Sequence, residues 1–111
     1  FIGDAHIEII GSWFGFPLIE MISNLFPIKQ IDIYDKDETC HKITAQYINQ
    51  FDYDFKIVQY GDYFERTELR RRHLVINTAC EHMNDLKDSR KYYKGTPTMI
   101  LQSNNYITIV L

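Results

Sequence analysis

Small and acidic residues stand directly after three short apolar runs of the sequence. The runs and the residues that follow them are His6–Ile10 with Gly11 and Gly15, Ile31–Tyr34 with Asp35, and Phe55–Tyr60 with Gly61 and Asp62. Glycine lets a backbone turn tightly and allows a ligand to approach closely. A carboxylate about 20 positions past a glycine turn can accept hydrogen bonds from both hydroxyls of a ribose. The spacing therefore predicts a nucleoside-binding site.

Each of these residues also has a purely structural interpretation, which the sequence leaves open. The two glycines could serve only the geometry of a turn between a strand and a helix. Asp35 could stabilise the start of a helix, although Asp37 is better placed for that role. Asp62 could cap a helix as well as meet an adenine amino group. Trp13 stands where a dinucleotide-binding fingerprint has glycine, which disfavours a bound pyrophosphate.

Polar residues also follow the fourth and fifth apolar runs. Leu74–Asn77 leads into Thr78-Ala79-Cys80-Glu81-His82, and Thr98–Gln102 leads into Ser103-Asn104-Asn105. A histidine of ordinary pKa suits general base catalysis, so Glu81 and His82 are candidate catalytic residues. His82 could instead be an exposed residue at a helix start, and Cys80 is better explained as a small buried residue than as a nucleophile.

The apolar runs and the segments between them predict alternating strands and helices. The expected strands are His6–Ile10, Ile31–Tyr34, Phe55–Tyr60, Leu74–Asn77, Thr98–Gln102 and Ile107–Leu111. Helical spacing predicts one apolar face of Leu18, Ile19, Ile22, Leu25 and Phe26, and another of Ile43, Thr44, Tyr47, Ile48 and Phe51. A polar helix is expected over Asp85–Tyr93, and a short helix with a loop over Asp62–Arg72. The alternation predicts an α/β fold with a doubly wound, mostly parallel sheet, which binds ligands at the carboxyl ends of its strands.

Composition restricts the classes of protein to consider. The 111 residues fit one domain, and 45% hydrophobic with 24% charged residues is a globular balance. A net charge of −3 argues against a general nucleic-acid binder. No apolar run reaches the roughly 20 residues of a membrane span. Two cysteines in no spaced motif indicate a reduced, cytoplasmic protein.

Two further features concern metals and charge. Cys40 and His41 are adjacent, so on a helix they point about 100° apart and are poor ligands for a shared metal ion. No metal site is therefore predicted. The basic run Arg70-Arg71-Arg72 could contact phosphate, although such a run more often forms a solvated face or a helix C-terminus. Phe1 and the apolar run Ile107–Leu111 at the two ends predict that residues 1–111 form a single domain of a longer chain.

From about His6 to Tyr106 the sequence resembles the class I S-adenosylmethionine-dependent methyltransferases. The resemblance rests on the glycine turn after the first strand, Asp35 after the second, Gly61-Asp62 after the third and Asn77 after the fourth. The stretches Asn77–His82 and Leu101–Tyr106 are also similar to a small, little-characterised methyltransferase-like group.

The glycine turn departs from the family pattern at two positions. Ile9 stands where the family has an acidic residue, and Trp13 stands where it has a middle glycine. Glu8 is shifted by one position from Ile9, and successive side chains of a strand point to opposite faces. The side chain of Glu8 is therefore expected on the face opposite to that of Ile9.

The resemblance implies S-adenosylmethionine as cofactor. It also implies a three-layer αβα Rossmann-like fold of strand order 3-2-1-4-5, here lacking the family's C-terminal antiparallel hairpin. The implied cofactor-binding residues are Gly11, Ser12, Trp13 and Gly15 beside the methionine part, Asp35 at the ribose, Gly61, Asp62 and Tyr63 at the adenine, and Asn77 facing the sulfonium. The implied residues on the acceptor side are Cys80, Asn104 and Asn105.

The leading hypothesis is an S-adenosylmethionine-dependent methyltransferase, or its cofactor-binding core, that acts on an unidentified small-molecule acceptor. An alternative is a cofactor-binding or scaffolding module of the same fold without turnover, working with a partner subunit or a second copy. A third is an NAD-dependent oxidoreductase, which Trp13 disfavours. Nucleic acid is a weakly supported partner, and no membrane association is expected.

Overall fold

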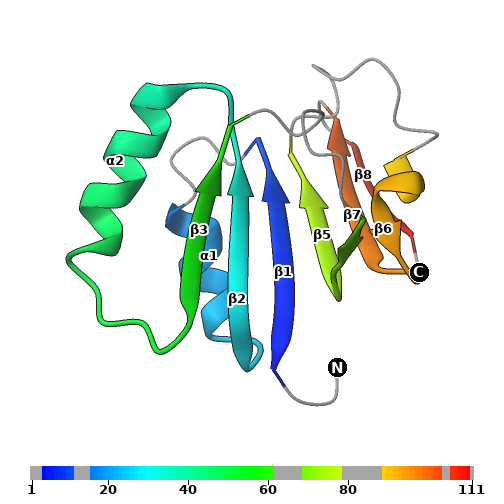
Figure 1. Ribbon diagram of the computed structural model, residues 1–111, viewed down its shortest axis with the longest axis horizontal. Coiled ribbons are helices and arrows are strands. Elements are labelled where there is room, and N and C mark those ends of the chain that lie inside the picture. Colours follow the sequence, from blue (N-terminus) through cyan, green and yellow to red (C-terminus); the bar gives the residue numbers. More distant parts are fainter. Residues whose placement is uncertain (1–3, 12–15, 62–68, 79–88, 104–105, 111) are drawn as a thin grey trace.

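The computed structural model describes residues 4–11, 16–61, 69–78, 89–103 and 106–110. Strands and helices alternate over residues 5–60, as Figure 1 shows, and mainly strands follow. The elements are β1 (Ala5–Ile10), α1 (Phe16–Ser23), β2 (Ile28–Tyr34), α2 (Glu38–Ile48), β3 (Lys56–Tyr60), β4 (Arg70–Arg71), β5 (Leu74–Asn77), a 3-10 helix (Ser89–Tyr92), β6 (Tyr93–Lys94), β7 (Thr98–Ser103) and β8 (Tyr106–Val110). None of the described helices is long and apolar enough to cross a membrane.

The main sheet has six strands in the order β3-β2-β1-β5-β7-β8, and the first five run parallel (Figure 1). Because β5 and β7 are the fourth and fifth strands expected from the sequence, the predicted order 3-2-1-4-5 is confirmed. A second, two-stranded parallel sheet joins β4 to β6.

The last strand was expected over Ile107–Leu111 and is observed as β8. It pairs antiparallel with β7, the fifth strand of the predicted order. Only residues 104–105 separate the two strands. A connection this short joins antiparallel strands, whereas a parallel neighbour needs a crossover of a dozen or more residues.

One face of the sheet is apolar and packs against α1. Isoleucines of β1 and β2 lie on this face, and α1 contributes Ile19 and Ile22 to the same core. The expected helix face also included Leu25, which is 68% exposed. The reason is that α1 ends at Ser23, so the helical spacing no longer applies to Leu25.

Helix α2 lies beside β3 at one end of the sheet (Figure 1). Its buried residues are Cys40 and Thr44. The predicted buried face of this helix is therefore correct only in part, at Thr44. Tyr47 and Phe51, which we expected to be buried, are 43% and 44% exposed. The helix turns the Cys40 side inward, and Phe51 lies beyond its last residue, Ile48. The failure at Phe51 comes from extending the helical period beyond the end of α2, whereas Tyr47 lies within α2, one residue before its end.

The other face of the sheet carries the polar and charged residues of the strands. Among the described residues, β4, β6 and the 3-10 helix stand in the chain where helices were expected over Asp62–Arg72 and Asp85–Tyr93. Residues 62–68 and 79–88 lie outside the described part. Tyr93 packs with Ile10, Tyr34, Val75 and Met99 in a second apolar cluster. The charged residues on this face are described with the functional site.

Candidate functional site

Three of the predicted residues meet at the carboxyl ends of neighbouring strands, an edge that we call the rim. The N–H of Gly11, after β1, donates to the carbonyl oxygen of Tyr34 at the end of β2 (2.8 Å). The N–H of Asp35, after β2, donates to the carbonyl oxygen of Tyr60 at the end of β3 (3.2 Å). Gly61 follows Tyr60 directly. The spatial order β3-β2-β1 therefore brings Gly61, Asp35 and Gly11 side by side.

The backbone at the rim turns sharply after β1. Gly11 has φ of 68°, in the left-handed region that favours glycine. Thr78, at the end of β5, donates its N–H to the carbonyl oxygen of Ile10 (3.0 Å), and its hydroxyl donates to the carbonyl oxygens of Ile10 and Gly11. A Cβ atom added at Gly61 would meet no atom of the described residues within 4 Å. The rim thus combines a fixed turn at Gly11 with open space at Gly61.

Asp35 and Asp37 divide two roles between them. Asp37 caps α2, because its carboxylate accepts the N–H of Thr39 (2.9 Å). This confirms that Asp37 fits the helix-capping role. Asp35 is half-buried, and its Oδ1 accepts the N–H of Asp37 (2.9 Å) in a local turn. Ribose binding by Asp35 stays a prediction.

Asn77 ends β5 and is almost fully buried, with 2% of its surface exposed. It lies in register with Ile10 of β1 and Leu101 of β7. The remaining predicted site residues lie outside the described residues. They are Ser12, Trp13, Gly15, Asp62, Tyr63, Cys80, Glu81, His82, Asn104 and Asn105.

Cys40 and His41 face different surroundings. Cys40 is buried in α2, and burial together with the negative charges of Asp35 and Asp37 raises the pKa of its thiol. The ring Nε2 of His41 lies 2.5 Å from the carbonyl oxygen of Asp35. Within the described part of the chain, no group of three or more His, Cys, Asp or Glu side chains is arranged to hold a metal ion.

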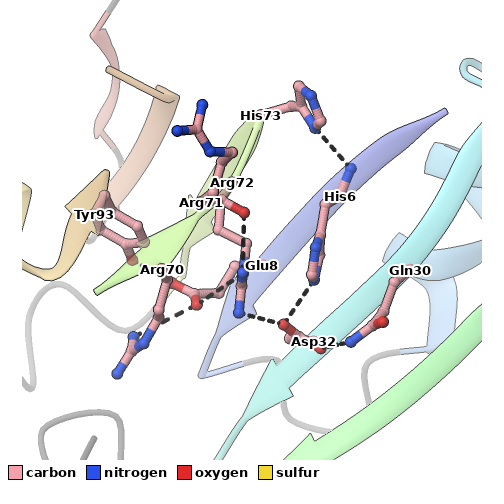
Figure 2. Close-up of polar contacts among 9 residues, drawn as sticks. All are labelled: His6, Glu8, Gln30, Asp32, Arg70, Arg71, Arg72, His73 and Tyr93. Atoms are coloured by element: carbon pink, nitrogen blue, oxygen red, sulfur yellow. Dashed lines mark hydrogen bonds and ion pairs between the residues drawn. The ribbon is translucent and has the colours of Figure 1, made fainter. Parts of the chain in front are cut away.

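A buried ionic cluster lies on the polar face of the sheet, below the rim (Figure 2). It consists of Glu8, Asp32, Arg70 and Arg72. Glu8 of β1 and Asp32 of β2 are directly opposite each other in register, and neither side chain is exposed. Ile9 belongs to the apolar core of the other face, so Glu8 points away from it as predicted.

Glu8 holds three side chains that come from two segments of the chain. Its Oε1 lies 3.5 Å from Nη1 of Arg70 and 3.5 Å from Nε of Arg72. Its Oε2 accepts a hydrogen bond from the hydroxyl of Tyr93. Burial raises the pKa of Glu8, and the hydrogen bond from Tyr93 and the two arginines offset this only in part.

Asp32 is also paired, and its pKa moves in the opposite direction. Its Oδ2 lies 2.6 Å from Nη2 of Arg72 and 2.9 Å from Nε2 of His6, and its Oδ1 accepts from Nε2 of Gln30 (2.7 Å). Burial alone would raise the pKa of Asp32, but the bonds from His6 and Gln30 and the charge of Arg72 together lower it.

The sequence interpretation missed this cluster. Arg70 and Arg72 were expected in a solvated face, at a helix end or on phosphate, but Arg70 is 1% exposed and Arg72 is held between two carboxylates. The signal was present as polar or charged residues two positions apart, at His6 and Glu8 of β1, at Gln30 and Asp32 of β2, and at Arg70 of β4 and Arg72 directly after it. Residues at that spacing share one side of a strand.

A groove of about 510 Å³ lies at the edge opposite to the rim. Its lining includes Asp4 before β1, Ile28 at the start of β2 and Phe55 before β3. The hydroxyl of Tyr53, which also lines the groove, donates to Glu20 of α1. The groove is therefore separate from the rim residues.

Known structures share this arrangement of strands and helices. A protein of Galdieria sulphuraria assigned as a sarcosine dimethylglycine methyltransferase superposes with a TM-score of 0.73 at 16% identity, over 89% of this chain and 39% of that one. A protein of Methanococcus maripaludis assigned as an S-adenosyl-L-methionine-dependent methyltransferase gives 0.67 at 17% identity, over 90% and 48%. The mycolic acid cyclopropane synthase CmaA1, solved with SAH and CTAB, gives 0.72 at 9% identity, over 89% and 36%.

The chain has a class I methyltransferase fold. It spans less than half the length of each of these three proteins. No family model matches the sequence, and no curated protein matches it. The methyltransferase fold confirms the predicted α/β architecture with its mostly parallel sheet, and in such sheets ligands bind beyond the carboxyl ends of the strands.

Proposed function

We propose that the chain binds an S-adenosyl ligand at the rim and forms the cofactor-binding part of a methyltransferase that acts on an unidentified acceptor. The observation that carries the proposal is the alignment of Gly11, Asp35 and Gly61 on three adjacent strand ends of a methyltransferase fold. A purely structural role in the turns after the strands explains each residue separately, but it does not explain why two glycines and a carboxylate occupy three adjacent strand ends.

The described rim residues fit an adenosine group. Gly61 leaves open space where a side chain would stand, so a flat base can approach the backbone there. One carboxylate oxygen of Asp35 accepts the N–H of Asp37, and the other can accept a ribose hydroxyl. Further proposed cofactor-binding residues are Ser12, Trp13, Gly15, Asp62, Tyr63 and Asn77.

Methyl transfer requires little chemistry from the side chains of the protein. When bound, S-adenosylmethionine supplies a methyl group that its sulfonium already activates. The chain's part is to hold the nucleoside and to align an acceptor. Cys80, Asn104 and Asn105 are proposed on the acceptor side. Glu81 or His82 is proposed as a base, which is needed only if the acceptor loses a proton.

A second candidate is a binding module of the same fold without turnover. The observation that keeps this candidate in place is that the likeness to the three solved proteins, at 9–17% identity, extends to the fold and not to activity. In that case a partner subunit or a second copy would complete the site. Product formation separates the two candidates, since both require the same nucleoside binding.

Calorimetric titration with S-adenosylmethionine, S-adenosylhomocysteine and NAD tests the proposal directly. We expect the first two to bind and NAD not to bind. If only NAD bound, the proposed cofactor would be wrong. If none of the three ligands bound, the proposed cofactor-binding function would be wrong. S-adenosylmethionine binding without any methylated product in a cell extract would favour the module without turnover.

Asp35→Ala should weaken binding of S-adenosylhomocysteine by about 1–3 kcal/mol, because hydrogen bonds to the ribose are lost. This corresponds to roughly 5- to 150-fold in Kd. Asp52→Ala is the matched control, since Asp52 is an exposed aspartate at the opposite edge and should leave Kd unchanged. Equal affinities for the wild type and Asp35→Ala would exclude Asp35 from the site.

A further inference from the structure

Two connections of the sheet end side by side on its polar face. The connection that leaves β3 at Gly61 ends in β4, and the connection that leaves β5 at Thr78 ends in β6. β4 and β6 pair with each other, with Arg70 opposite Tyr93 and Arg71 opposite Lys94. β4 therefore follows the rim residue Gly61 in the chain, β6 follows the rim residue Thr78, and the two strands pair in one small sheet.

The carboxylate of Glu8 contacts one residue of β4 and one residue of β6. Glu8 of β1 pairs with Arg70 through Oε1 (3.5 Å) and accepts the hydroxyl of Tyr93 through Oε2. Arg70 and Tyr93 are also the register partners of the small sheet. The guanidinium of Arg70 lies over the ring of Tyr34 of β2, at 4.9 Å from its centroid. Figure 2 shows Glu8 on β1 with Arg70 and Tyr93 beside it.

Because of these contacts, detaching β4 or β6 alone from the main sheet costs free energy. Glu8 and Arg70 are fully buried, so lifting β4 alone would leave the Glu8 carboxylate without one of its buried countercharges. Lifting β6 alone would remove the hydrogen bond that Tyr93 donates to the same carboxylate. Buried groups that share a partner respond as one unit rather than separately.

We propose that Glu8, Arg70 and Tyr93 fasten β4 and β6 into a single cooperative unit, so that a ligand at the rim that slows the opening of β4 also slows the opening of β6. The coupling between β4 and β6 does not depend on the identity of any ligand. Its use at the rim rests on the proposed function, since the rim residues Gly61 and Thr78 precede β4 and β6 in the chain.

Amide hydrogen exchange of the free protein tests the coupling. Peptides covering 69–73 and 91–95 should open together in the wild type. Tyr93→Phe removes only the hydroxyl and keeps the Glu8–Arg70 pair, yet it should reduce protection in both peptides. Glu8→Gln should reduce protection in both by the same factor, on the order of tenfold or more.

The matched control is Glu20→Gln. Glu20 also accepts a tyrosine hydroxyl, that of Tyr53, but it lies on α1 rather than on β1, β4 or β6. It should leave both peptides unchanged. Protection of β1 and β2 reports whether each variant is folded, and if Glu8→Gln unfolds, Tyr93→Phe decides. Loss of protection confined to 91–95 in Tyr93→Phe would overturn the proposal.

Saturating S-adenosylhomocysteine then tests the use of the coupling. We expect slower exchange in both peptides of the wild type, and in 69–73 alone in Tyr93→Phe. If the ligand binds but slows amide exchange only in peptide 69–73 of the wild type, the proposed coupling from β4 to β6 is wrong and the proposed function stands. If no binding heat and no change in exchange occur, the proposed function fails, whereas the coupling seen in the free protein stands.

Discussion

Ile31 and Asp32 are neighbours in β2, and both are completely buried, yet they point to faces of opposite chemistry. Ile31 packs among isoleucines against α1, whereas Asp32 bonds with Arg72, His6 and Gln30. Apolar burial needs only matching shape, because dispersion and the hydrophobic effect have no direction. Charged burial needs every partner in place. The two faces should therefore respond differently to the loss of one side chain.

The largest effect is expected on the polar face. Asp32→Ala should lower the free energy of unfolding by about 3–5 kcal/mol, because Arg72 loses its closest countercharge in a buried setting. Urea denaturation at neutral pH measures this. Asp52→Ala, at an exposed aspartate, should stay within about 0.5 kcal/mol. A loss under 1 kcal/mol for Asp32→Ala would show that water solvates the cluster.

On the apolar face, Ile31→Ala should lower the free energy of unfolding by about 2–5 kcal/mol, from lost burial and the cavity left behind. The same denaturation experiment applies. Met21→Ala on the same helix-covered side should change little, because Met21 is 62% exposed. The comparison between faces is sharpened by Ile31→Val. It should be mild, about 0.5–1.5 kcal/mol if it resembles other loss-of-methyl changes.

A smaller effect is expected at the start of α2. Asp37→Ala removes the carboxylate that accepts the N–H of Thr39, and caps of this kind contribute about 1 kcal/mol. Thermal unfolding followed by circular dichroism measures the change. Asp37→Asn keeps an acceptor oxygen and should recover most of the loss. If both variants are equally destabilised, the charge of Asp37 matters more than its hydrogen bond.

The smallest effect is the pH dependence, since the two buried carboxylates act in opposite directions. The pKa of Glu8 is raised above 4.5, so its contribution to stability grows as the pH falls through its folded pKa toward 4.5. The pKa of Asp32 is lowered below 3.8, so its contribution is present above 3.8 and is lost as the pH falls through its folded pKa. Urea unfolding at a series of pH values should show the acid loss in the wild type and a reduced loss in Asp32→Asn.

The six strands of the main sheet could be predicted from the sequence because apolar runs of β-branched residues mark them directly, whereas their order followed from the resemblance to the class I methyltransferases. Leu74–Asn77 was predicted with the bounds that the structure has. Helix faces were less predictable, because Leu25 and Phe51 fit a helical period although each lies beyond the end of its helix. A period shows which residues would share a face, but not where a helix ends.

The rim and the ionic cluster differ in how visible they are in the sequence. Gly11, Asp35 and Gly61 follow their strands directly, so a parallel sheet places them at one edge. The pairing of Glu8 with Arg70 joins residues 62 positions apart, and nothing local to either residue indicates the other. Arg70 and Tyr93 lie in two-residue strands, which are too short to produce an alternating pattern.

The opposed positions of Glu8 and Asp32 also bear on how the sheet assembles. β1 and β2 carry isoleucines along their length, so hydrophobicity alone distinguishes poorly between correct pairing and a slip by one residue. A slip would turn one of the two carboxylates toward the isoleucines beneath α1, without a countercharge. The two acids thus raise the free energy of misaligned pairings of β1 and β2, which leaves one register as the stable outcome of folding.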